Sequence, residues 1–173
     1  MNNKWVASLE RGIVVLIDWM GRATVWIALA MIALVATNVL LRYAFSLGSV
    51  WAQELEWHLL AALILLGMSY ALQRGDNVRV DLFYAHFSPA VRRIVDGVSL
   101  LLLLAISLYF IKLALAYVGQ SYAILEGSPD PGGIPYRWVV KALIPLGYAL
   151  VALQCLGQLL GLARGRAGES RHV

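Results

Sequence analysis

Lys112 is a single charge within a long apolar stretch of the sequence, residues 97–125. An ammonium group in such surroundings is costly, so a specific contact or a function is the first expectation. Three interpretations stay open: its stem carries the charge to lipid phosphates, the charge contacts a partner protein, or it binds a substrate or an ion. Each of them presupposes a membrane, which the rest of the sequence has to indicate.

Acidic and basic residues also stand beside the second apolar stretch. Glu54 and Glu56 precede residues 57–73, and Arg42 lies a short connection earlier, at the end of the first stretch. A carboxylate that carries protons or drugs in a small exporter would be expected in the middle of a span, whereas these two stand at its edge. We therefore predict that Arg42 and Glu54 form an ion pair that joins the ends of two helices.

Histidine and cysteine are too scattered to hold a haem or a metal. His58 opens an apolar stretch, whereas His86 lies in a connection and His172 in the C-terminal tail, so no two of them can face each other as axial ligands. The single Cys155 can form neither an intramolecular disulfide nor a zinc cluster. There is also no P-loop or nucleophile elbow. We expect no cofactor and no enzyme activity.

The elements that position these residues are apolar and long. Hydrophobic residues make up 61% of the chain and charged residues 14%, against about 45–50% and 25% in a typical soluble domain. Since about 20 apolar residues in a helix cross the hydrocarbon core, the composition predicts an all-α integral membrane protein with four transmembrane helices in one membrane domain, residues 1–173. The expected spans are approximately 23–42, 54–73, 94–118 and 138–163. The first apolar stretch is too long for the core of a cleaved signal peptide, so we expect it to be retained.

The basic residues predict how the spans are oriented. Ten of them flank the same side of the membrane as the termini, and three flank the opposite side. The ten are Lys4, Arg11, Arg22, Arg74, Arg79, Arg92, Arg93, Arg164, Arg166 and Arg171, and the three are Arg42, Arg137 and Lys141. Because loops rich in Lys and Arg stay in the cytoplasm, we expect both termini and the central connection there. Their spread over several connections also argues against nucleic acid as a partner, despite a net charge of +4.

Two segments outside the spans show amphipathic patterns. In residues 5–20, apolar side chains recur at helical spacing, which indicates either an interfacial helix or an extension of the first span. In the connection between the second and third spans, Val78, Val80, Leu82 and Phe83 give an apolar side that could lie on the membrane surface. Ser88-Pro89 then predicts the start of the next helix.

Glycines within the spans indicate close helix packing. Gly157 and Gly161 form a GxxxG pattern in the fourth span, and Gly67 lies within the second. Such patterns are frequent in apolar helices, so they identify no particular partner.

Five short motifs are distributed along the chain: Asn38-Val-Leu-Leu-Arg42-Tyr43, Trp51-Ala-Gln53-Glu54-Leu55, Leu66-Gly67, Arg74-Gly-Asp-Asn77-Val-Arg79-Val-Asp81 and Pro145-Leu-Gly147. Together they resemble the small membrane subunit of tripartite ATP-independent periplasmic (TRAP) transporters. The fourth motif is the most specific, being similar to the family's Arg-x-x-x-His-Ile-Arg-Val-Asp. Two positions differ, because Gln53 replaces the first family Glu and Asn77 replaces the usual His.

The resemblance implies a three-part assembly in a bacterial inner membrane. A periplasmic solute-binding protein delivers a carboxylate-bearing solute, and a large multi-span subunit holds the sodium and substrate sites. The small subunit supports the large one, in contact with membrane lipids. On this basis Arg42 and Glu54 would join helix ends, and Arg74, Arg79 and Asp81 would fix the cytoplasmic connection by ion pairs and phosphate contacts.

Two other classes stay open from the residues alone. The chain could be a self-sufficient small exporter that works as a homodimer, or the membrane anchor of a redox complex. Transport by the purified chain in liposomes would indicate the first class, and bound haem or quinone the second.

Overall fold

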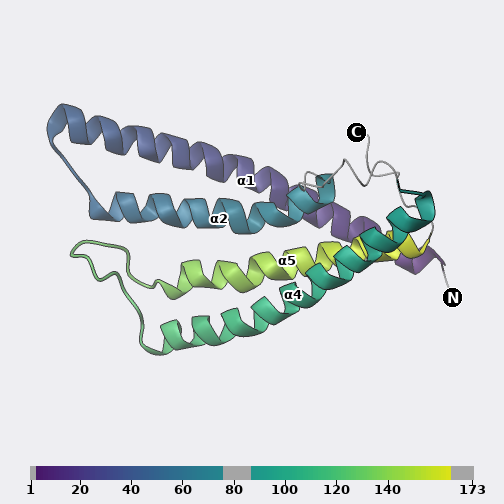
Figure 1. Ribbon diagram of the computed structural model, residues 1–173. Helices are drawn as coiled ribbons and strands as arrows, with labels where there is room; N and C mark the ends of the chain where they lie inside the picture. The colour runs from purple at the N-terminus through teal and green to yellow at the C-terminus, as the bar shows by residue number, and fades with distance from the viewer. Residues whose placement is uncertain (1–2, 76–86, 165–173) are drawn as a thin grey trace.

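The computed structural model describes residues 3–75 and 87–164, which form four α-helices (Figure 1). The helices are α1 (Asn3–Phe45), α2 (Val50–Arg74), α4 (Pro89–Ala123) and α5 (Trp138–Ala163). Each is long and apolar enough to cross a membrane. The prediction of an all-α protein with four membrane-spanning helices is thereby confirmed. The predicted amphipathic connection and the residues Arg79 and Asp81 lie outside the described residues.

Local signals in the sequence set several helix ends. Ser49 caps α2 by accepting a hydrogen bond from the backbone N–H of Ala52, and Gly75 ends the helix in the left-handed conformation with φ of 75°. Ser88 caps α4 in the same way and Pro89 occupies its first turn, as the Ser-Pro pair predicts.

Helix α1 continues without a break from Asn3 to Phe45, a total of 43 residues. At 1.5 Å per residue it is about 64 Å long, roughly twice the thickness of the hydrocarbon core. Residues 5–20 are therefore part of the same continuous helix as the first span.

Helix α5 is the central element. It packs against α4, α2 and α1, and α1 packs against α2. In the most apolar 18-residue segment of α5, a third of the residues are buried, compared with 6–11% in the corresponding segments of the other helices. Figure 1 shows two hairpins, α1–α2 and α4–α5, whose connections lie at one end. We call this end, with residues 46–49 and 124–137, the loop end, and the opposite end, where α1 begins and α5 ends, the terminal end.

Small residues allow the helices around α5 to approach closely. A Cβ atom added to Gly147 would lie 2.6 Å from the backbone oxygen of Leu65 in α2, so only glycine fits there. One and two turns further along α5, Val151 and Cys155 pack with Leu100 of α4 and Leu72 of α2. The core is thus a thin seam along α5, and most of each outer helix faces away from the protein.

Candidate functional site

The most elaborate polar cluster of the described residues lies at the loop end, around Glu54. The side chain of Glu54 is 3% exposed although it sits only in the second turn of α2. Its carboxylate accepts hydrogen bonds from the hydroxyl of Ser128, from the backbone N–H of Ile134 at 2.6 Å and from the guanidinium of Arg137 at 3.0 Å. We call these four residues the Glu54 latch. All three donors belong to the α4–α5 connection or its end, so the latch joins the two hairpins.

The backbone of the α4–α5 connection is shaped to bring these donors together. The N–H of Ser128 binds the carbonyl of Ile134, and Gly132 adopts a φ of 81° between them. A Cβ atom at Gly133 would lie 2.5 Å from the Cβ of Ser128 and 2.7 Å from Oε2 of Glu54. A glycine is required at that position because the carboxylate occupies the space of a side chain.

A second ion pair closes the same connection. Lys141 in the first turn of α5 donates a hydrogen bond to Glu126, and its ammonium lies 4.0 Å from the ring centre of Tyr117 in α4. The hydrogen bond from Lys141 lowers the pKa of the Glu126 carboxyl below its ordinary value. The start of the connection, at Glu126, is therefore joined to Lys141 of α5. Its end, at Arg137, is joined to Glu54 of α2.

The predicted ion pair between Arg42 and Glu54 is wrong. Glu54 pairs with Arg137, whose side chain is 28% exposed, and Arg42 lies exposed in the last turn of α1. Near the loop end, the side-chain amide of Asn38 in α1 donates a hydrogen bond of 2.9 Å to Glu56 in α2. Acidic side chains thus join helix ends, as expected. The partner of Glu54 is Arg137, and the partner of Glu56 is the uncharged amide of Asn38.

The terminal end has its own contacts between helices. Arg164 after α5 pairs with Glu10 of α1 at 3.0 Å. Asp18 of α1 lies 3.8 Å from Arg74 at the end of α2 and accepts a hydrogen bond from Gln73 at 3.3 Å. Arg74 therefore joins two helices in the structure. The connection that the resemblance implied it would fix lies outside the described residues.

The three glycines expected at helix contacts have different surroundings. A Cβ at Gly157 would lie 3.3 Å from Cγ2 of Ile13, and one at Gly161 would lie 3.1 Å from the Glu10 carboxylate. Both glycines therefore lie on the side of α5 that faces α1. At Gly67, a Cβ would meet the Thr24 methyl at an ordinary 3.9 Å.

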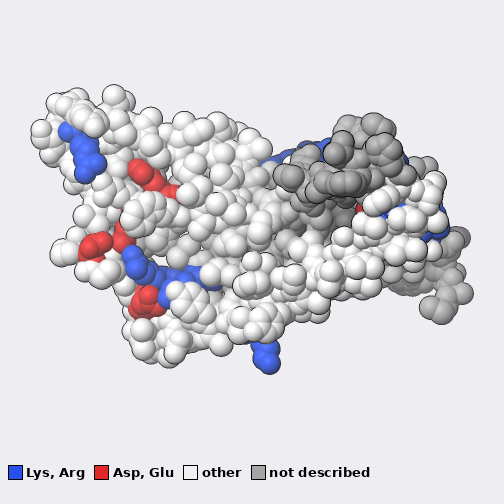
Figure 2. Space-filling model, in the orientation of Figure 1, with Lys and Arg blue, Asp and Glu red and all other residues white. Residues whose placement is uncertain are grey.

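Lys112 is exposed on α4, on the side away from α5. The described residues include no hydrogen-bond or ion-pair partner for it. In Figure 2 the charged side chains of the visible face gather toward the two ends, and an isolated basic side chain stands out from the uncharged middle.

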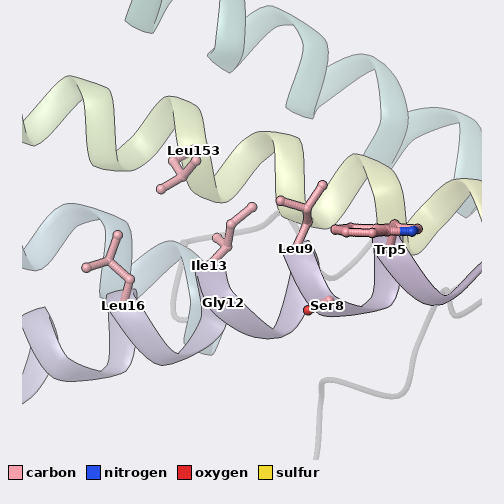
Figure 3. Close-up of a pocket in the computed structure, with 7 residues that line it drawn as sticks. All are labelled: Trp5, Ser8, Leu9, Gly12, Ile13, Leu16 and Leu153. Carbon is pink, nitrogen blue, oxygen red and sulfur yellow. The ribbon is translucent and has the colours of Figure 1, made fainter.

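A groove of about 310 Å³ lies between the first part of α1 and α5 (Figure 3). Its lining is apolar apart from the hydroxyl of Ser8 and the indole N–H of Trp5, and consists of Trp5, Ser8, Leu9, Gly12, Ile13, Leu16 and Leu153. This lining carries no charged group, so the groove suits hydrocarbon rather than a charged solute.

Arg137 and Ser128 are the important residues that sequence reasoning missed. The sequence showed Arg137 only as one of three basic residues on its side of the membrane, and Ser128 only as part of a turn. A weak signal was present, because Glu126 and Lys141 flank the Pro- and Gly-rich connection with opposite charges.

Comparison with known proteins gives one family. The family model described as "Tripartite ATP-independent periplasmic transporters, DctQ component" matches residues 31–165, which is more than half of the chain and includes the whole Glu54 latch. A search of curated proteins finds no match.

Proposed function

The chain belongs to the DctQ component family of the tripartite ATP-independent periplasmic transporters, and on this premise we propose that it is the scaffold of the large transport subunit. In this role it supports sodium-coupled uptake of a carboxylate-bearing solute, which a periplasmic binding protein delivers. It catalyses no reaction itself, and it lies in a bacterial inner membrane.

The Glu54 latch is the observation that carries this proposal. A transport site needs polar groups that face a space where a solute fits. Instead, the carboxylate of Glu54 is enclosed by three donors from the α4–α5 connection. Four other acids also bind side chains across helices or connections: Glu10, Asp18, Glu56 and Glu126. Acids used in this way hold helix ends in position, which is what a support requires.

The proposal includes an orientation with both termini in the cytoplasm. It is supported by the bias of basic residues and by the position of Asn3 and Arg164 at the same end of the four helices (Figure 1). The loop end with the Glu54 latch then faces the periplasm, the side from which a binding protein delivers solute.

Arg42, Arg74, Arg79 and Asp81 are part of the same proposal. Arg42 at the loop end and Arg74 at the terminal end provide forked cations for lipid phosphates or for acids of the large subunit. Asp81 is an acid in a basic cytoplasmic segment, which suggests that it has a specific partner. Replacing Asp81 with Ala should therefore reduce uptake. Unchanged uptake at normal expression would contradict that role.

Co-purification with the large subunit is the test of the proposed function. The affinity-tagged chain is expressed together with the multi-span protein from the adjacent reading frame, extracted in mild detergent and analysed for stoichiometry. We expect a complex that takes up solute in liposomes only when the binding protein and a sodium gradient are present. Solute export by the purified chain alone, or haem or quinone bound to it, would favour the two other classes instead.

A further inference from the structure

We propose that the face of α4 centred on Lys112 docks a helix of the large membrane subunit, and that this helix offers a carboxylate to the Lys112 ammonium. This inference rests on the proposed function and adds to it the surface and the chemistry of the contact.

The buried side of α4 is narrow and regular. Its buried residues are Leu100, Ser107, Ala114 and Ser121, which recur every seventh position and lie on one face of the helix. At about 100° per residue, Lys112 lies roughly 160° around the helix from Ala114. The side chain therefore leaves α4 on the face opposite to the contact with α5.

Lys112 lies within its span. It precedes residue 118, the end of the expected span, by about 9 Å along the helix, and Ala123, the last residue of α4, by about 16 Å. Tyr117, whose ring contacts Lys141 near the loop end, is about 7–8 Å closer to that end. An exposed ammonium within the hydrocarbon is costly unless it reaches the interface or pairs with an opposite charge.

A lipid phosphate cannot pair with the Lys112 ammonium at this position. The Cα–Cβ bonds of a helix tilt toward its N-terminus, so the stem of Lys112 starts away from the nearer headgroups at the loop end. Its reach of roughly 6 Å is less than the distance to the level of Tyr117. The charge is therefore left in hydrocarbon unless a protein covers it.

A second copy of this chain cannot pair with the Lys112 ammonium either. A symmetric dimer about this face would place one Lys112 ammonium beside the other, and like charges repel strongly in hydrocarbon. The described residues of α4 near Lys112 include no acid, since Asp96 lies far toward the terminal end. The occupant is therefore a different chain that carries the opposite charge.

The rest of the face suits close approach of a helix. Between Lys112 and the loop end it presents Ala116, Gly119 and Ala123, and a Cβ at Gly119 would meet open space. Small residues at this spacing let the backbones of two membrane helices come together, which brings a facing carboxylate within reach of the ammonium.

Substitutions at Lys112 test the charge directly in the co-expressed complex. We expect Lys112→Arg to retain the large subunit, and Lys112→Gln and Lys112→Met to reduce its recovery about three- to thirtyfold, the range of one interhelical polar contact in a membrane. Arg93→Met is the matched control, because Arg93 is an exposed cation of α4 outside this face, and it should retain the complex. Full recovery with Lys112→Met or Lys112→Gln overturns the proposal.

A photo-crosslinking residue at Leu108, one turn from Lys112 and 56% exposed, identifies the occupant. A crosslink to the large subunit supports the inference, whereas crosslinks to lipid only or to a second copy of the chain overturn it. If the wild-type chain fails to retain the large subunit at all, the proposed function itself fails. If the wild-type complex forms and the Lys112 variants match it, only this inference fails.

Discussion

Glu54 and Arg137 meet at 3.0 Å although 83 residues separate them in the chain. The side chain of Glu54 is almost completely buried, whereas that of Arg137 is partly exposed. This pair joins the start of α2 to the start of α5, and with them the two hairpins of the protein.

Replacing Glu54 with Gln should destabilise the protein by about 1–3 kcal/mol. The amide keeps the shape but replaces one acceptor oxygen with a donor, which faces the donors of Ser128 or Ile134. The measurement is thermal unfolding of the purified chain in detergent, with Glu56→Gln as the control at the neighbouring acid. A double-mutant cycle with Arg137→Gln should give a coupling of roughly 0.5–3 kcal/mol, and additive effects would show that the two side chains do not interact.

Arg42 and Arg137 should differ sharply in their effect on stability. Arg42→Gln removes an exposed charge and should change the free energy of unfolding by less than about 0.5 kcal/mol. Arg137→Gln leaves the buried carboxylate of Glu54 without its counter-charge and should be clearly destabilising. Equal melting temperatures for the two variants would argue against the pairing seen in the structure.

Three Gly→Ala variants should rank by the space around each glycine. Gly147→Ala places a methyl group against the backbone of Leu65 and should cost about 1–3 kcal/mol. Gly157→Ala meets a side chain, that of Ile13 at 3.3 Å, rather than backbone and should cost less. Gly12→Ala meets nothing and should be neutral or stabilising by up to ~1 kcal/mol. Melting temperatures in the reverse order would contradict the helix packing around α5.

Glu126 should make stability depend on pH in the acidic range. The hydrogen bond from Lys141 lowers the pKa of Glu126 in the folded protein, with the charge of Arg137 acting in the same direction. A lowered pKa contributes stability that is complete above the unfolded value of about 4.3 and is lost as the pH falls through the folded value. We therefore expect the stability difference between wild type and Glu126→Gln to be constant above about pH 5 and to shrink below about pH 4. A difference that grows on acidification would reverse the assigned sign.

The orientation can be tested with a reporter enzyme that is active only in the periplasm. Fusion after residue 128, in the α4–α5 connection, should give activity, and fusion after residue 173 should not. The opposite pattern would exclude cytoplasmic termini and would place the Glu54 latch on the cytoplasmic side.

The four helices could be predicted from the sequence because each depends on a local signal. Long runs without charge mark the spans, and Ser88-Pro89 marks the start of α4 with the residues that cap it. The length of α1 was harder to predict, since an amphipathic pattern in residues 5–20 is equally compatible with a separate interfacial helix.

The partner of Glu54 could not be predicted in the same way. Arg42 is closer in sequence and has the right charge, but Arg137 is brought to Glu54 by a connection that depends on tight turns at Gly132 and Gly133. Those turns also deliver Ser128 and the N–H of Ile134, which no count of charges would suggest. Glu54 could therefore be identified from the sequence as a residue that joins helix ends, whereas the residues that bind its carboxylate could not.

The distance along the chain between Glu54 and Arg137 also has a consequence for biogenesis. At about 5–20 residues per second, the ribosome needs roughly 4 to 17 seconds to add the 83 residues between them. During that interval the Glu54 carboxylate lacks the counter-charge that Arg137 provides in the folded protein. A chain that stops before residue 128 therefore carries Glu54 with none of its three donors from the α4–α5 connection.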